Sequence, residues 1–374
     1  MSTPPHSAST PRLASQLLAM INDLVSSGAT AVGARITSLF HQGESWLLDR
    51  KRAQYGLAVL RILLGATVVG MLLTNWSTRL YTFGAGVSWS GQHGLPTSGF
   101  SDVWIVNAII KASTNDGLFT ALYILLGVAA IAFLLGYRSR LALLVMFPMW
   151  VGLVEINELV SDQSDNLTRI VMIALFFAAP SERWSLDAKR RARFVTSNGN
   201  AISRLWRMQP VLPAWSTNLA QNLAIIVLAA QVFFIYVAGG LYKAGGEPWS
   251  GGWALYDPIH TVQFGTWPEL STLVTAWGPT VAALTALTLL VQIGFPLMLM
   301  RRGTRIFALI VVLCFHLGIA VLMGLPWFSL AMIAIDAIFI RDVTWRSMAR
   351  AIRQAWARAV PDTAHSPSLA SLTV

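Results

Sequence analysis

The sequence predicts an all-α polytopic membrane protein with about eight transmembrane helices. Of its 374 residues, 55% are hydrophobic and only 12% are charged, against roughly a quarter charged in an ordinary soluble domain. Its mean hydropathy is +0.58, and apolar runs near the ~20 residues that cross a bilayer recur along the chain. These observations exclude a disordered chain and argue against a water-soluble globule.

Eight apolar segments are the predicted spans. They cover residues 54–74, 117–136, 141–160, 165–180, 219–241, 278–300, 305–323 and 326–340. The fourth and eighth segments are short for a full crossing, so tilting or burial by neighbouring helices is expected there. No terminal apolar core with a small-residue cleavage site precedes the first segment, which is therefore expected to remain as a span.

Basic residues indicate the orientation of these spans. With both termini in the cytoplasm, every loop satisfies the positive-inside rule, and the outer side holds only Arg79, Lys111 and Lys243. The net charge of +10 is then explained by topology and by contact with anionic lipid, so the bilayer is an expected partner and nucleic acid is not. Residues 184–207 form the strongest basic stretch. The predicted location is the cell membrane, as a multi-pass protein.

Two regions flank the transmembrane domain predicted at 51–341. Residues 1–50 are expected to be a cytoplasmic region with an amphipathic helix on the membrane surface. Its apolar residues recur at spacings of three and four, at Leu13, Leu17, Ile21 and Leu24. Residues 342–374 are expected to be a basic cytoplasmic tail.

Charged residues at membrane depth are costly, so each is a candidate site or half of a pair. Arg61 in the first segment and Asp336 in the eighth lie at similar depths from the inner side. A structural ion pair between Arg61 and Asp336 is therefore expected.

Acidic and polar residues gather where the third segment ends and the fourth begins. Glu155 and Glu158 are three residues apart and could share a proton, while Asp165 and Arg169 are spaced to pair along one helical face. Asn166 and Arg169 have two open interpretations, lining a cavity or ordinary helix packing. No metal site is expected, because no histidine with ligand spacing lies nearby and the chain has a single cysteine.

The fifth segment ends in a glycine-rich stretch that carries Lys243, one of only four lysines. Its glycines, which allow close approach of a helix or ligand, are Gly239, Gly240, Gly245 and Gly246. The alternative for Lys243 is a cation that snorkels to the membrane surface. His316 lies in the middle of the seventh segment and is either a packed core residue or a functional one. Cys314 sits among apolar residues and is expected to be structural.

Four stretches of the chain resemble the horizontally transferred transmembrane (HTTM) domain family, which is related to the membrane part of vitamin K-dependent gamma-carboxylase. Residues Ile235–Trp249, which include Lys243, resemble the hallmark of that family. The other matches are Leu60–Gly65 in the opening helix, Asp165–Arg169 followed by Trp184–Asp187, and His316–Met332 in a late helix. Together the matches cover about residues 50–340.

The resemblance implies a quinol-using site. Lys243 falls on the lysine that deprotonates reduced vitamin K in the carboxylase, and His316 falls on a family histidine in the same core. We therefore expect Lys243 and His316 to be catalytic, and a reduced quinone (menaquinol or vitamin K-like) to be the cofactor. The expected cofactor-binding residues are Asn166, Arg169, Tyr242, Gly239 and Gly240. The carboxylase also has an Asn-His pair in the helix that here carries Asp165 and Asn166, and this chain has no histidine there.

The sequence leaves two possible functions. The first is a quinol-dependent, oxygenase- or carboxylase-like membrane enzyme with an outward-facing site around Lys243. The second is a non-enzymatic or partner-dependent factor for maturing or exporting a secreted peptide, since the compact chain resembles sporulation-delaying protein B. Its partner would be an exported peptide or a second membrane or secreted protein. A transporter is less favoured, because no repeated halves are found.

Overall fold

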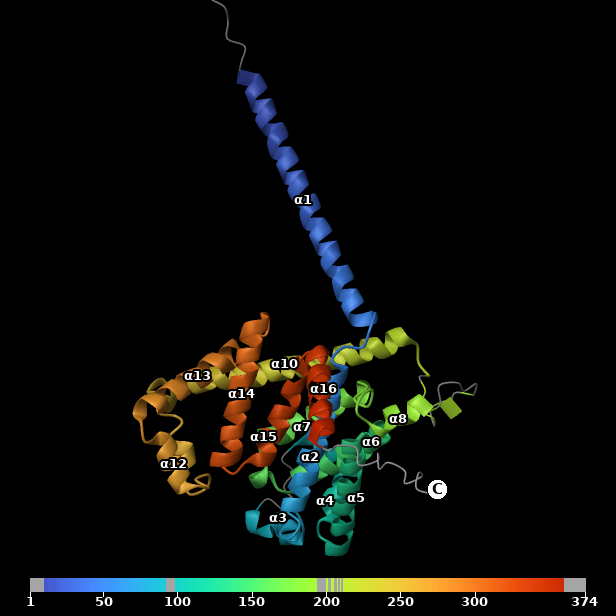
Figure 1. Cartoon of the computed structure of the whole chain (residues 1–374), viewed down its shortest axis with the longest axis vertical. Coiled ribbons are helices and arrows are strands. Elements are labelled where there is room, and N and C mark those ends of the chain that lie inside the picture. The colour runs from blue at the N-terminus through green and yellow to red at the C-terminus, as the bar shows by residue number, and fades with distance from the viewer. Residues whose placement is uncertain are drawn as a thin grey trace, which may run out of the picture.

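The computed structural model describes residues 10–91, 98–193, 200, 203–204, 207, 209 and 211–359. Helices make up most of this part of the chain, and no strand occurs in it (Figure 1). The predicted all-α fold class is therefore confirmed. A helical bundle forms the body of the molecule, and α1 (Thr10–Leu48) stands away from it.

Six helices are long and apolar enough to cross a membrane. They are α2 (Gln54–Thr74), α5 (Asp116–Leu135), α6 (Ser139–Ile156), α10 (Ala214–Ala244), α13 (Gly278–Met298) and α14 (Arg302–Leu322). The two short predicted spans also form helices, α7 (Gln163–Phe177) and α15 (Pro326–Asp336). These two are shorter than a full crossing, so the structure supports a membrane protein with six candidate spans. Eight full spans and the orientation of the termini stay predictions.

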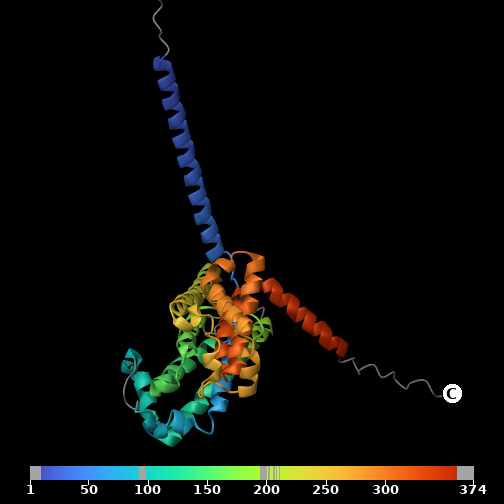
Figure 2. The same cartoon turned by 90° about the vertical axis from the view of Figure 1, so that its left-hand side faces the viewer.

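Short helices connect the spans. They are α3 (Arg79–Thr82), η1 (Ala85–Ser90), η2 (Gly99–Asp102), α4 (Trp104–Ala112), η3 (Glu158–Val160), α8 (Leu186–Arg193), α11 (Glu247–Ser250), η4 (Asp257–His260), α12 (Pro268–Thr275) and η5 (Ala337–Phe339). The last helix, α16 (Asp342–Ala359), projects from the bundle in a different direction from α1 (Figure 2).

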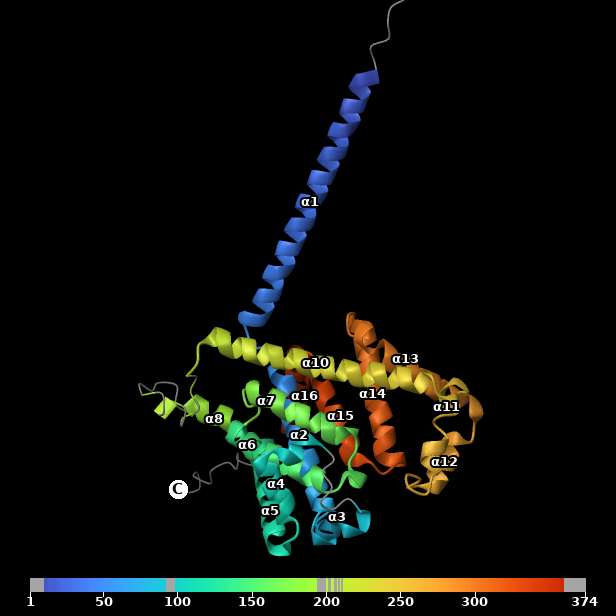
Figure 3. The same cartoon turned by 180° about the vertical axis from the view of Figure 1, so that it is seen from behind.

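The core forms around α2, which packs against α5 on one side and α15 on another. Leu57, Leu60 and Leu64 of α2 are buried by these neighbours. The sequence of α2 is apolar on nearly every face, which suits a helix that is surrounded by other helices. A Cβ atom on Gly65 would lie 2.7 Å from the Cβ of Leu134, so glycine is needed for α2 and α5 to approach this closely. Long α10 runs across the bundle in Figure 3, in contact with α7 and α13, and α14 closes the far side against α15.

The expected Arg61–Asp336 ion pair is wrong. Arg61 is fully buried and donates to four backbone carbonyls, those of Phe133, Leu134, Pro180 and Trp184. Two of these carbonyls are at the end of α5, where the last turn of a helix leaves carbonyls without intrahelical partners. The others lie in the connection after α7. Backbone acceptors thus replace the carboxylate that the depth of Arg61 suggested.

Candidate functional site

Four helices bring five polar side chains together inside the bundle. We call this group the Lys243 cluster, and its members are Tyr236 and Lys243 of α10, Gln292 of α13, His316 of α14 and Asp336 of α15. Tyr236 and Lys243 are seven residues apart, which is two helical turns, so both lie on the same face of α10.

Lys243 lies at the last turn of α10, with its ammonium among aromatic rings. Its Nζ donates to Gln292 Oε1 at 3.1 Å. It also lies 5.1 Å from the ring centroid of Trp249 and 5.6 Å from that of Phe315. An ammonium has three donors, and within the described part of the chain the one hydrogen bond goes to Gln292. The rings of Trp249 and Phe315 add cation–π contacts when Nζ is protonated.

Gly240 explains why Gln292 reaches Lys243. A Cβ atom on Gly240 would lie 2.8 Å from Ile293 Cγ1 and 3.1 Å from Gln292 Cβ. Any larger residue would therefore push α13 away from α10. A Cβ atom on neighbouring Gly239 would meet nothing within 4 Å. Gly240 thus sets the distance between the two helices, and Gly239 faces open space.

His316, Tyr236 and Asp336 form a buried hydrogen-bonded chain. The Tyr236 hydroxyl donates to Asp336 Oδ2 at 2.7 Å and lies 3.3 Å from His316 Nε2. The hydroxyl has one proton, which goes to Asp336, so its oxygen can accept from a His316 ring protonated at Nε2. The ring of Tyr236 also packs edge-on against Phe295, with centroids 4.8 Å apart.

Two atoms of this chain have no hydrogen-bond partner in the described part of the protein, namely His316 Nδ1 and Asp336 Oδ1. Leaving a buried polar atom unpaired costs about 1–3 kcal/mol. Polar groups inside a membrane protein are costly even when they are paired. Two unpaired atoms lower the stability of the fold, so this cluster is better explained by ligand binding or proton transfer than by a structural role.

The two residues predicted to be catalytic therefore lie in one cluster. Lys243 contacts the ring of Phe315, which directly precedes His316. The residues predicted to bind a cofactor lie elsewhere, apart from Gly240. Tyr242 is 88% exposed on the outer face of α10, and Asn166 is exposed on α7.

Comparison with known families decides the identity of the fold. A family model for the HTTM domain matches residues 50–345. The chain belongs to the HTTM family. The matched region runs from just before α2 to the first turn of α16, so the HTTM domain contains the whole Lys243 cluster. Neither the curated proteins nor the solved structures contain a match to the chain.

A second polar cluster of the HTTM domain surrounds Arg169. Its Nη1 lies 3.3 Å from Glu155 Oε1, and its guanidinium lies 5.4 Å from the ring centroid of Phe100. Glu155 also accepts from Ser98 Oγ at 2.7 Å. Glu155 thus pairs with Arg169, whereas Glu158, which by its spacing could have shared a proton with Glu155, is exposed on η3. In the described part of the chain, the ion pair of Arg169 is with Glu155. These two residues belong to α7 and α6, whereas Lys243 belongs to α10.

Asp165 has a local structural role in the HTTM domain. Its Oδ2 accepts from the backbone nitrogen of Asp162 at 2.8 Å, and Asp162 in turn accepts from the backbone nitrogen of Ser164. This capping box at the start of α7 satisfies backbone donors that the helix leaves unpaired. Asp165 and Asp162 therefore fix the beginning of α7.

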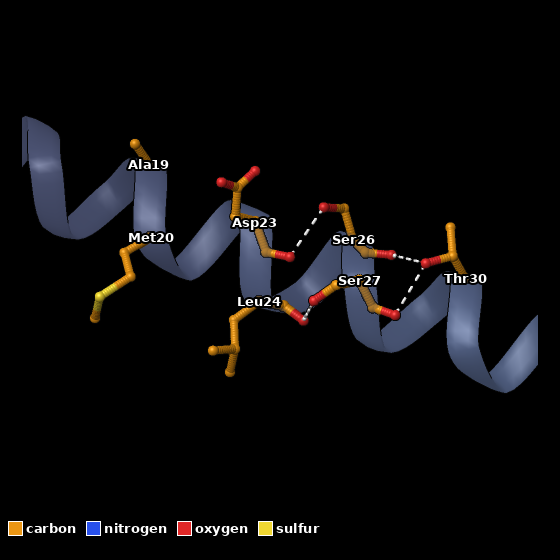
Figure 4. Close-up of a pocket in the computed structure, with 7 residues that line it drawn as sticks. All are labelled: Ala19, Met20, Asp23, Leu24, Ser26, Ser27 and Thr30. Atoms are coloured by element: carbon orange, nitrogen blue, oxygen red, sulfur yellow. Dashed lines mark hydrogen bonds between the residues drawn. The ribbon is translucent and has the colours of Figure 1, made fainter.

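Two hollows of the HTTM protein lie away from the Lys243 cluster. Figure 4 shows the first, whose lining residues all belong to α1: Ala19, Met20, Asp23, Leu24, Ser26, Ser27 and Thr30. The second is an apolar groove of about 510 Å³ between α7 and α10, lined by side chains such as Ile173, Phe177 and Leu223. Among the described residues, no group of three or more histidine, cysteine, aspartate or glutamate side chains is placed to hold a metal ion.

Three residues at the site were not predicted from the sequence: Tyr236 and Gln292, which belong to the Lys243 cluster, and Trp249, which lies beside it. Gln292 is a lone amide in an apolar helix, which is a signal of function at membrane depth. Tyr236 lies two turns before Lys243, so helical periodicity could have assigned it to the same face. Trp249 reaches Lys243 only because the chain turns into α11 after the glycines, and sequence spacing does not predict such a contact.

Proposed function

We propose that this HTTM protein is a membrane enzyme that binds a reduced quinone at the Lys243 cluster and takes a proton from it. The observation that carries the proposal is the surroundings of Lys243, which combine one amide acceptor with two aromatic faces. An amine with a single protein hydrogen bond has hydrogen-bonding capacity left for a ligand hydroxyl, and flat rings beside it suit a flat aromatic ligand.

The residues fit a quinol on chemical grounds. Trp249 and Phe315 supply apolar walls, and the Lys243 amine and the Gln292 amide supply the few polar contacts that orient a ligand in such sites. The unpaired Nδ1 of His316 supports the fit, because a buried acceptor of this kind suits a hydroxyl donor. When bound, a quinol would supply acidic hydroxyl protons and two reducing electrons.

The chain's own residues divide the work in this proposal. Lys243 acts as the neutral amine: the Nζ lone pair accepts the hydroxyl proton, so that an O–H bond breaks, an N–H bond forms and an ammonium results. Gln292 Oε1 accepts from the resulting ammonium and holds its position. Tyr236 and Asp336 keep the His316 ring in one orientation through the hydrogen bonds at 3.3 and 2.7 Å, as outer partners do for many functional histidines.

The resemblance of Ile235–Trp249 to the lysine-bearing stretch of gamma-carboxylase supports the same assignment. The chain has no histidine in the helix that carries Asp165 and Asn166, where the carboxylase has an Asn-His pair, and Asn166 is exposed. We therefore propose quinol deprotonation as the activity, with oxygen consumed because a deprotonated quinol would pass its two electrons to O₂ and leave a quinone and peroxide. Modification of an exported peptide is a further step that this geometry does not require.

Oxygen uptake by the purified protein with a reduced naphthoquinone tests the proposal. We expect turnover by the wild type and a loss of at least about 100-fold in Lys243→Arg, a size typical of a removed general base. Arginine keeps the charge but cannot give up its proton near neutral pH. Lys111→Arg is the matched control, because Lys111 is exposed on α4, and it should retain full activity.

Two results would overturn the proposal. Full activity in Lys243→Arg at wild-type membrane abundance would make Lys243 an interfacial cation only. No turnover by folded wild type with any quinol would favour the second function, a partner-dependent factor for maturing or exporting a secreted peptide.

A further inference from the structure

Helix α16 (Asp342–Ala359) is an element that the proposed quinol site does not use. None of its residues is buried, and Figure 2 shows it projecting from the bundle without a neighbour along most of its length. The sequence predicted a basic tail here, and the structure forms a helix of 18 residues.

One face of α16 is apolar and exposed. Met348, Ile352 and Trp356 recur every four residues, so they line up along one side of the helix. Their exposed fractions are 49%, 68% and 71%. A continuous exposed apolar face of this kind is typical of a binding surface for lipid or protein, and no described residue of the chain packs on it.

The opposite face of α16 is basic. Arg346, Arg350 and Arg353 follow one another at spacings of four and three, which places them together. Among the described residues none of these three arginines makes an ion pair. The helix contains one acid, Asp342, and its carboxylate already accepts from the backbone nitrogens of Gln54 and Tyr55 at 3.2 and 2.9 Å.

The first turn of α16 is fixed to the bundle. Asp342 caps the beginning of α2 through the two hydrogen bonds above, where a carboxylate is favoured by the helix dipole. The indole of Trp345 donates to the carbonyl of Ala337 at 3.4 Å and packs edge-on against Trp184. The helix therefore leaves the bundle at the end where α15 finishes and α2 begins, which is at a membrane boundary if α2 spans the bilayer.

We propose that α16 lies on an anionic bilayer surface, with its apolar face inserted between lipids and its arginines bound to phosphate headgroups. Charge complementarity selects this partner: among the described residues the three arginines have no carboxylate partner, the one acid of α16 is already bonded to α2, and each basic residue near an anionic membrane contributes attraction. A tryptophan-containing apolar face opposite arginines is typical of helices that lie in the interface. This inference stands apart from the quinol site and does not depend on it.

Probes on the two faces of the full-length protein test the inference. In a Cys314→Ala background, Ile352→Cys carries an environment-sensitive fluorophore on the apolar face, and Gln354→Cys carries it on the arginine face. Both sites are exposed on the helix. Each protein is placed in nanodiscs of phosphatidylcholine alone and in nanodiscs that also contain phosphatidylglycerol.

We expect the probe at position 352 to shift to the blue and resist aqueous quencher in the anionic nanodiscs, while the probe at 354 stays in water. Replacing Arg346, Arg350 and Arg353 with glutamine should abolish that shift, and high salt should weaken it. Equal responses at 352 and 354, or a shift that is the same without phosphatidylglycerol, would overturn the inference. Protection of position 352 that rises with protein concentration in detergent would also overturn it, in favour of a second copy of the chain.

Discussion

Arg61 and Lys243 are two cations inside the same bundle, and their surroundings differ sharply. Arg61 is fully buried, and its guanidinium donates to four backbone carbonyls. Lys243 is half-buried and donates to a single amide oxygen beside two aromatic rings. The first cation has used most of its donors on the protein itself, whereas the second has donors to spare.

The difference separates a structural charge from a functional one. A guanidinium bound to carbonyls at the end of α5 and in the connection after α7 joins these two segments, and losing it would remove a hydrogen-bond partner from each of them. An amine with one partner can exchange that partner for a ligand or release its proton without undoing the fold. We therefore assign Arg61 to stability and Lys243 to function.

Replacing Arg61 should have the largest effect on folding. Arg61→Met keeps an apolar stem but removes every donor, so four carbonyls lose a partner, at about 1–3 kcal/mol for each one left buried and unpaired. We expect little folded protein in the membrane, measured by abundance and by size-exclusion chromatography in mild detergent. Normal abundance of Arg61→Met would contradict the structural role and weaken the comparison.

Gly240 tests the Lys243 side of the comparison. Gly240→Leu should move α13 away from α10 and separate Gln292 from Lys243, because a Cβ atom already meets Ile293 at 2.8 Å. Overpacking of this kind typically costs about 1–3 kcal/mol, so we expect lowered thermal stability and loss of quinol-dependent turnover. Gly239→Leu is the control, since position 239 is open. Equal losses in both variants would show that helix spacing is not the cause.

Glu182 lies in the connection that supplies Arg61 with carbonyls. Its carboxylate contacts Lys51 and lies 3.6 Å from Arg191. Burial raises the pKa of Glu182, but the hydrogen bond and charge of Lys51, with Arg191 and Arg183, outweigh burial and lower the pKa below its usual 4.5.

A lowered folded-state pKa means that Glu182 stabilises the fold above pH 4.5 and that this contribution is lost as the pH falls through the folded value. Glu182→Gln should therefore cost about 1 kcal/mol at neutral pH and reduce the acid-induced drop in melting temperature. Melting curves of the two proteins across this pH range provide the measurement. An identical pH profile for both would rule out the contribution.

Cys314 should give the smallest effect. It is exposed on α14, two residues before His316, so its side chain lies on a different face from the histidine. Cys314→Ala should keep abundance, melting temperature and turnover within error of the wild type, because surface substitutions usually change stability by less than about 0.5 kcal/mol. Loss of turnover with retained folding would mean that the thiol takes part in the site.

The sequence predicted the helices better than their contacts. Apolar length located α2 to the residue, because a run of hydrophobic residues bounded by basic ones directly reflects the bilayer. The resemblance to the HTTM family, and not apolar length, led to the expectation that Lys243 and His316 share one core. Depth along the spans mispaired Arg61 and Asp336, because the acceptors that Arg61 uses are main-chain carbonyls, which every residue has and no side-chain pattern reveals.

Tyr242 and Gly240 show the same limit within one motif. Both belong to the glycine-rich stretch around Lys243, yet Tyr242 faces outward and Gly240 packs against α13. Motif membership does not say which face of the helix a residue occupies, whereas helical spacing from Tyr236 to Lys243 does. Gln292 joined the site only through tertiary packing.

Photolabelling with an azido-substituted naphthoquinone tests most directly whether the quinol site is at Lys243. Labelled protein would be digested, and the modified residues mapped by mass spectrometry with and without excess menaquinone. The account predicts label on Trp249 or Phe315 that menaquinone removes. Competed label found only in the groove between α7 and α10, or no competed label on folded protein, would contradict it.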